Sequence, residues 1–125
     1  MIESKLIYKN TLDKKYIKEI IKEELGKLNY NFKYIGTEYL VEVIYFLYST
    51  KEYYRFSLEA DIYPIIANKY GCSCKTVKSN IVNATDKMFY DCNESVLKRY
   101  IGKYKIEKPG PKAIIKSVLK RIKDI

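Results

Sequence analysis

Residues 66–77 read Ile66-Ala67-Asn68-Lys69-Tyr70-Gly71-Cys72-Ser73-Cys74-Lys75-Thr76-Val77, a pattern of two helices joined by a tight turn. Ala67 supplies the small residue that is needed where two such helices cross. Gly71 follows four residues later, where the turn requires a left-handed backbone that glycine adopts at little cost. Ser73 is placed to cap the second helix, because its side chain can accept a hydrogen bond from a free backbone N–H group. This is the layout of a helix-turn-helix.

The apolar residues of this segment fit the packing of one short helix against the next; they are Ile66, Tyr70, Cys72 and Val77. One position departs from the pattern, because polar Asn80 stands where an apolar residue is usual and Ile81 lies beside it. Any tight helical hairpin shares much of the pattern. The spacing alone therefore leaves two possibilities open, a DNA-binding unit and a plain structural hairpin.

The second helix of the motif is expected to present small polar and basic side chains to solvent, namely Lys75, Thr76, Lys78, Ser79, Val82 and Asn83. From Lys69 to Asn83 the sequence has three lysines and no carboxylate. A recognition helix reads base edges in the major groove with residues of this kind near its N-terminus. The alternative is an ordinary solvated helix face.

Helical periodicity extends over the whole chain, and no segment alternates with a period of two. Thr11 is predicted to cap a first helix that ends near Gly26 or Leu28. Its apolar residues form one stripe, which consists of Tyr16, Ile17, Ile20, Ile21, Leu25 and Leu28. This stripe must be buried, either against the chain's own core or against a second copy.

Five further helices are predicted after the first. One opens at Gly36 with Thr37 as its cap and is apolar over most of its circumference, which is typical of a central helix. The next spans 57–70, with a kink or a start at Pro64. The others are a long helix from Ser73 to about Tyr90, a short helix capped by Asn93, and a last helix after Pro109-Gly110-Pro111. The fold class is therefore all-α, with about six helices.

The chain has 125 residues, of which 47% are hydrophobic and 31% charged. This size suits one domain, and we expect an amphipathic helical arm over residues 1–30 and a helix-turn-helix domain over residues 31–125. The N-terminus lacks the features of a signal peptide, and the most apolar run, at residues 43–48, is far too short to span a bilayer. We therefore expect a cytoplasmic protein without a membrane partner.

Catalytic and metal-binding chemistry is poorly supported by the composition. Histidine is absent, which removes the commonest general base and the commonest metal ligand. Cys72 and Cys74 form Cys-x-Cys rather than Cys-x-x-Cys, and with Cys92 they provide three thiols but no fourth ligand for zinc. We expect no enzyme activity, no catalytic residue, no metal, no cofactor and no small-molecule ligand.

Positive charge is concentrated at the C-terminal end. The formal net charge is +9, and residues 98–125 carry ten positive and two negative side chains. Four of the lysines, Lys108, Lys112, Lys116 and Lys120, recur every four residues and would form one stripe on a helix. Such a stripe is typical of a surface that tracks the phosphates of a polyanion. The alternative is a basic tail that only contacts solvent.

From about residue 35 to residue 122 the chain resembles the C-terminal effector domain of stage-zero sporulation protein A, the response regulator of endospore formation. The shared features are Gly36-x-x-Tyr39-Leu40, then Ile62-Tyr63-Pro64-x-Ile66-Ala67-x-Lys69-Tyr70, then Val77-x-x-x-Ile81-x-x-Ala84, and finally Lys108-Pro109. The resemblance implies a compact six-helix domain that binds DNA as tandem or paired copies.

Two departures limit what this resemblance implies. The family's recognition helix is rich in arginine at positions that here hold Thr76, Ser79, Val82 and Asn83, so the family's target sequence is not implied. We also expect no phosphorylatable receiver domain, since residues 1–30 are too few to form one, so control by phosphorylation is not implied. On this comparison the N-terminal helix is an addition of this protein.

The leading hypothesis is a small protein that binds double-stranded DNA sequence-specifically. It would act as a transcriptional regulator or as an accessory factor in recombination or excision, such as mobile elements and prophages carry. A homodimer, or copies side by side on DNA, is expected. The predicted DNA-binding residues are Lys69, Ser73, Lys75, Thr76, Lys78, Ser79, Val82, Asn83, Lys108, Lys112 and Lys116.

Two alternatives stay open. The missing arginines and the 14 tyrosines also suit a protein-binding module, such as a phage-type inhibitor, on a degenerate helix-turn-helix fold. The aromatic residues that motivate this alternative are Tyr45, Tyr48, Tyr53, Tyr54, Phe56 and Tyr63. Tyrosine stacking on single-stranded nucleic acid is a second alternative.

Overall fold

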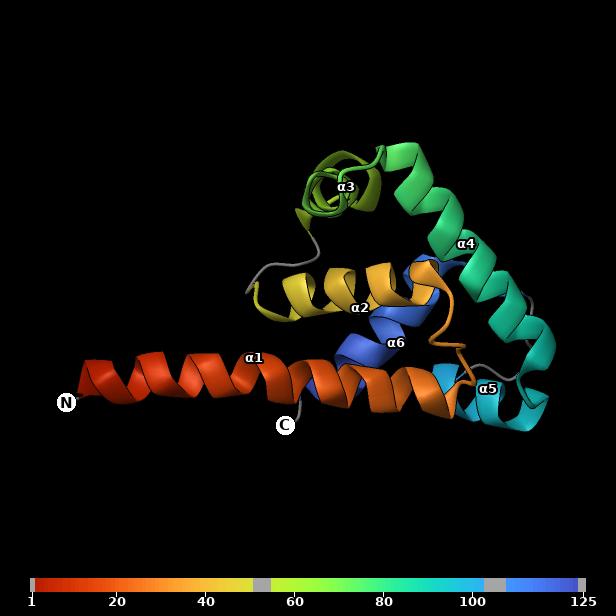
Figure 1. The fold of residues 1–125 in the computed structure, drawn as a ribbon. Coiled ribbons are helices and arrows are strands. Elements are labelled where there is room, and N and C mark those ends of the chain that lie inside the picture. The colour runs from red at the N-terminus through yellow and green to blue at the C-terminus, as the bar shows by residue number, and fades with distance from the viewer. Residues whose placement is uncertain (1, 51–54, 103–107, 124–125) are drawn as a thin grey trace.

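The computed structural model describes the backbone of residues 2–50, 55–102 and 108–123, with side chains from Lys14 onward. These residues form six α-helices and one π-helical turn, and they include no strand (Figure 1). The elements are α1 (Ile2–Lys27), α2 (Ile35–Tyr48), the π turn η2 (Leu58–Ile62), α3 (Tyr63–Tyr70), α4 (Cys74–Asp91), α5 (Glu94–Ile101) and α6 (Pro111–Ile122). The predicted all-α class is confirmed.

The helix-turn-helix is present where the sequence predicted it. Pro64 lies in the first turn of α3, directly after η2, and so starts the helix instead of interrupting it. Gly71 ends α3 in the left-handed conformation, with φ of +66°. Ser73 caps α4, because its Oγ accepts a hydrogen bond from the Thr76 N–H at 3.1 Å.

Two predicted caps are wrong. Helix α1 begins at Ile2, so Thr11 lies inside it; threonine can cap a helix only where the chain leaves the helical conformation, and residues 2–10 contain no glycine or proline that would stop it. Helix α2 begins at Ile35, with Tyr34 at its cap position. The buried hydroxyl of Thr37 instead donates a hydrogen bond to the Asn31 carbonyl at 2.7 Å.

Helix α2 lies at the centre of the molecule, with α1 and α6 on one side and α3 and α4 on the other (Figure 1). The backbones of α2 and α4 approach each other closely at Gly36. A Cβ atom placed on Gly36 would lie 1.9 Å from the carbonyl oxygen of Asn80 and 2.5 Å from its carbonyl carbon. Only glycine fits at this crossing.

The second half of α1 belongs to the same core. Its stripe is buried against the chain itself, where α1 contacts α2 and α6; the buried stripe residues are Ile17, Ile20, Ile21, Leu25 and Leu28. Tyr16 is the exception, since 58% of it is exposed. The buried part of the stripe is therefore not free to pair with a second copy. The predicted boundary between an arm (residues 1–30) and a domain (residues 31–125) stays a prediction. The first half of α1 extends beyond the other helices (Figure 1).

Polar groups inside the core are paired. The hydroxyls of Tyr30 and Thr85 lie 2.9 Å apart, and the Tyr100 hydroxyl donates to the Glu24 carboxylate at 3.3 Å. Burial raises the pKa of both tyrosines well above its ordinary value, so both phenols stay protonated and can donate. In the part of the chain that the structure describes, no buried side-chain nitrogen or oxygen lacks a partner.

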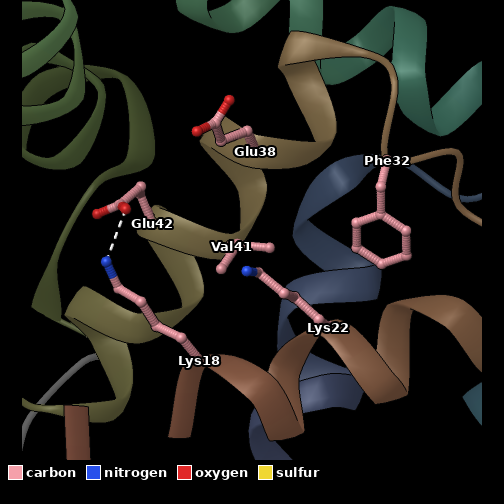
Figure 2. Close-up of a pocket in the computed structure, with 6 residues that line it drawn as sticks. All are labelled: Lys18, Lys22, Phe32, Glu38, Val41 and Glu42. Carbon is pink, nitrogen blue, oxygen red and sulfur yellow. Dashed lines mark hydrogen bonds and ion pairs between the residues drawn. The ribbon is translucent and has the colours of Figure 1, made fainter. Parts of the chain in front are cut away.

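One ion-pair cluster joins three helices. The Glu42 carboxylate on α2 binds the Lys18 ammonium of α1 at 2.7 Å and the Lys69 ammonium of α3 at 2.9 Å; Figure 2 shows the contact with Lys18. Only 15% of the Glu42 side chain is exposed. Burial alone would raise the pKa of Glu42, but the hydrogen bonds from the two lysines outweigh burial, and the pKa lies below its ordinary value.

None of the described helices is long and apolar enough to cross a membrane.

We predict that Gly36→Ala destabilises the protein by about 3 kcal/mol or more, because the added methyl group collides with backbone atoms that cannot move aside without separating α2 from α4. Gly26→Ala is the matched control. Its new methyl group would be 3.9 Å from the nearest atom, in a helix, and alanine there stabilises the protein by about 0.5–1 kcal/mol. Urea denaturation of both variants measures the two effects. Equal stabilities would contradict the close crossing.

We also predict that Glu42→Gln lowers the free energy of unfolding by about 1–2 kcal/mol at neutral pH, because it removes charged hydrogen bonds to Lys18 and Lys69. The folded-state pKa of Glu42 is depressed, so the stabilisation is present above the ordinary value of 4.5 and disappears as the pH falls through the lower folded-state value. Parent and variant should therefore converge in acid.

Denaturation at pH 7 and at stepwise lower pH measures this convergence. Glu19→Gln serves as the control, since Glu19 forms an exposed pair with Lys22 at 3.6 Å and should change stability by less than about 0.5 kcal/mol. A constant difference between parent and Glu42→Gln at every pH would refute the assigned role of the carboxylate.

Candidate nucleic-acid interface

One face of α4 is buried and the other is open to solvent. Val77, Ile81, Ala84 and Met88 point into the core at helical spacing. On the opposite face the exposed side chains are Lys75, Thr76, Ser79 and Asn83, and Val82 is half-buried beside them. Five of the predicted contact residues thus share one face of this helix, which we call the outer face of α4.

Local hydrogen bonds order the first turns of α4. The Ser73 and Thr76 hydroxyls lie 2.9 Å apart, and the Thr76 carbonyl accepts from the Ser79 hydroxyl at 3.3 Å and from the Asn80 amide at 2.8 Å. Lys75 and Asn83 make no side-chain hydrogen bond or ion pair within the described residues. One ammonium and one carboxamide are therefore available on the outer face.

Lys78 lies at the edge of the outer face, where α4 approaches the start of α6. Lys78, Val82 and Lys112 line a hollow of about 450 Å³ together with residues of η2. Lys112 and Lys116 also line an adjoining hollow of about 140 Å³ against exposed Phe56. The structure thus brings the predicted contacts of α6 next to those of α4.

Lys108 does not belong to the α6 stripe, because α6 begins only at Pro111. Its ammonium instead binds the Asp86 carboxylate of α4 at 3.1 Å and lies 5.6 Å from the centre of the Tyr90 ring. Lys112, Lys116 and Lys120 are exposed on α6. The C-terminal lysines therefore approach α4 at two places. Lys112 lies near Lys78 in the second turn of α4, and Lys108 binds Asp86 in its C-terminal half.

Lys69 is directed toward α2. Its ammonium binds Glu42 at 2.9 Å and lies 5.7 Å from the centre of the Tyr70 ring. Lys69 is therefore not among the residues that line the hollow shared by Lys78 and Lys112.

Sequence reasoning missed three carboxylates that bind predicted contact lysines. Glu42 binds Lys69, Glu59 binds Lys78, and Asp86 binds Lys108. A signal existed for Asp86, which lies seven residues after Ser79 and so shares its helix face. Glu42 and Glu59 lie on other elements, so the sequence around Lys69 and Lys78 does not predict these ion pairs.

The outer face of α4 and the start of α6 can perform recognition by contact. Lysine ammonium groups bind phosphate oxygens, the Asn83 amide can read an adenine edge, and Val82 can lie against a thymine methyl group. Within the described residues, no group of three or more potential ligands could hold a metal ion. Cys72, Cys74 and Cys92 are free thiols.

A separate hollow of about 440 Å³ lies between α1 and the first half of α2. Figure 2 shows the residues that line it, which are Lys18, Lys22, Phe32, Glu38, Val41 and Glu42. Its charges are mixed, and none of its lining residues lies on α3 or α4. It is therefore separate from the outer face of α4, although Glu42 at its edge binds Lys69 of α3.

The aromatic residues considered for protein binding differ in exposure. Tyr63 is buried, Tyr45 and Tyr48 are half-buried against the core, and 39% of Phe56 is exposed. Tyr53 and Tyr54 lie outside the described residues. The remaining candidates do not form one exposed aromatic surface.

Comparison with known proteins identifies the family. A search of curated proteins found no match to this chain. The family model described as "Sporulation initiation factor Spo0A C terminal" matches residues 17–122, which is most of the chain. The match begins inside α1, so the expectation that the whole N-terminal helix is an addition is wrong for its second half. The chain belongs to the family of the Spo0A C-terminal domain, a family of DNA-binding helical domains.

Proposed function

We propose that this protein binds double-stranded DNA sequence-specifically by placing α4 in the major groove. The observation that carries the proposal is the outer face of α4, where available polar side chains stand on a capped helix that a glycine turn joins to α3. Membership of a DNA-binding family supports the same function.

Phosphate contacts would come from α4 itself and from α6. Lys75 lies in the first turn of α4, and Lys112 and Lys116 approach from α6. These residues carry charge without bidentate geometry, so they suit phosphates better than guanine edges. Base reading then falls to Thr76, Ser79, Val82 and Asn83.

The biological role proposed is regulation of transcription or assistance to recombination, since both use DNA binding without chemistry. A single helix-turn-helix reads only a few base pairs, so two copies side by side on DNA are needed for useful specificity. Since the stripe of α1 is buried against the chain's own core, we place the contact between copies elsewhere.

We predict that Lys75→Ala combined with Lys78→Ala lowers affinity for duplex DNA at least tenfold at about 0.1 M salt, because up to two phosphate contacts are lost. The slope of log affinity against log salt should become shallower by about 1–2 units. Fluorescence anisotropy with a labelled duplex, repeated across salt concentrations, measures both quantities.

The control removes the same charge from exposed positions of α1, with Lys15→Ala and Lys22→Ala. This control should bind almost as tightly as the parent. If both double variants lost the same affinity, the effect would reflect net charge, and α4 would not be the recognition helix.

We further predict that duplexes selected from a random pool share an AT-rich motif present in two copies. Asparagine pairs with adenine and valine with thymine methyl groups, whereas α4 carries no arginine, whose planar side chain forms the two-pronged contact with guanine. Sequencing the bound pool identifies the motif. Enrichment of consecutive G·C pairs would contradict the assigned readers, and a single unrepeated site would contradict the paired arrangement.

A further inference from the structure

Glu59 is held at a fixed place beside the recognition helix. It lies in η2, where the Ser57 hydroxyl accepts a hydrogen bond from the Ala60 N–H at 3.2 Å. The Asp61 carboxylate in turn accepts from the Ser57 N–H at 2.7 Å. These reciprocal bonds do not involve the Glu59 side chain, so they position its backbone and leave its carboxylate able to bind Lys78.

The Glu59 carboxylate forms an ion pair with the Lys78 ammonium. Both side chains are more than half exposed, at 66% and 52%, so the pair lies at the surface, open to ions and to a polyanion. Glu59 and Lys78 line the same hollow as Val82 and Lys112. The Glu59 carboxylate thus lies beside the side chains that are proposed to contact DNA.

A phosphate and this carboxylate compete for the same ammonium. An exposed ion pair contributes only about 0–1 kcal/mol, so a phosphate can displace Glu59. After displacement, however, the carboxylate remains beside the phosphate and repels it. Each phosphate contact of Lys78 therefore yields less affinity than an unpaired lysine would provide.

Building on the proposed function, we propose that Glu59 is a specificity-determining residue that restrains phosphate binding by Lys78. Phosphate contacts are independent of sequence. A carboxylate that weakens such a contact lowers affinity for every duplex and leaves base contacts to decide which site is occupied. A second exposed lysine–carboxylate pair, Lys108 with Asp86, lies farther along α4, and there the carboxylate is on α4 itself.

The chain offers a matched control for this charge. Glu94 binds Lys98 at 3.2 Å in an exposed pair on α5, and 72% of its side chain is exposed. Glu94→Gln therefore removes one exposed, lysine-paired carboxylate, as Glu59→Gln does, but Glu94 does not line the hollow that Lys78 and Lys112 share. Any effect of net charge alone should be equal in the two variants.

The experiment measures binding of the full chain to a mixed-sequence duplex between about 50 and 200 mM salt. Glu59→Gln should bind about two- to fivefold more tightly than Glu94→Gln at the lower salt concentrations. Its salt slope should be steeper by up to about one unit, because Lys78 then neutralises a phosphate fully. A merely structural role would not steepen this slope, and melting temperatures confirm that both variants are folded.

A double-mutant cycle tests whether Glu59 acts through Lys78. In a Lys78→Ala background, Glu59→Gln should lose most of its gain in affinity. A full gain there would overturn the assigned pairing, and equal affinities of Glu59→Gln and Glu94→Gln in the parent background would overturn the proposal itself. A parent protein that binds no duplex even at the lowest salt would instead refute the proposed function, a result that is distinguishable from both.

Discussion

The position of α4, the proposed recognition helix, depends on one backbone contact, between Gly36 of α2 and the Asn80 carbonyl of α4. Because no side chain separates the two helices there, the distance between them is set by backbone atoms, which cannot change rotamer. Asn80 lies in the second turn of α4, beside Ser79 and Ile81. The contact therefore fixes the part of α4 that carries the candidate base-reading residues, and α3 and α6 pack around an already defined pair of helices.

Local signals in the sequence were reliable where backbone geometry is decided locally. Gly71, Ser73, Pro64 and Asn93 each stand where a helix must end or begin, and the structure uses each as predicted. Thr11 and Thr37 failed because a capping residue does not by itself stop a helix. The helix-compatible residues before Thr11 and the packing around Thr37 decided those boundaries, and neither can be read from the capping residue alone.

The electrostatics of the candidate site could not be predicted in the same way. Residues 69–83 contain no acidic side chain, yet in the fold Lys69 and Lys78 are both paired with carboxylates from other elements. Glu42 precedes its partner Lys69 by 27 residues and Glu59 precedes Lys78 by 19 residues. Such pairs form only when helices pack together. A count of charges along one segment therefore overestimates the positive electrostatic potential at the surface that a polyanion would contact.

The limits of the family match coincide with the first and last buried residues among the described side chains. Within the described side chains, Ile17 is the first buried residue and Ile122 the last, and the match covers residues 17–122. The second half of α1, which packs on α2 and α6, therefore lies inside the family match. Burying five apolar side chains there contributes about 1.5–3 kcal/mol each. Glu42 then links Lys18 of this half-helix to Lys69 of the helix-turn-helix, so α1 supports the DNA-binding unit through both packing and charge.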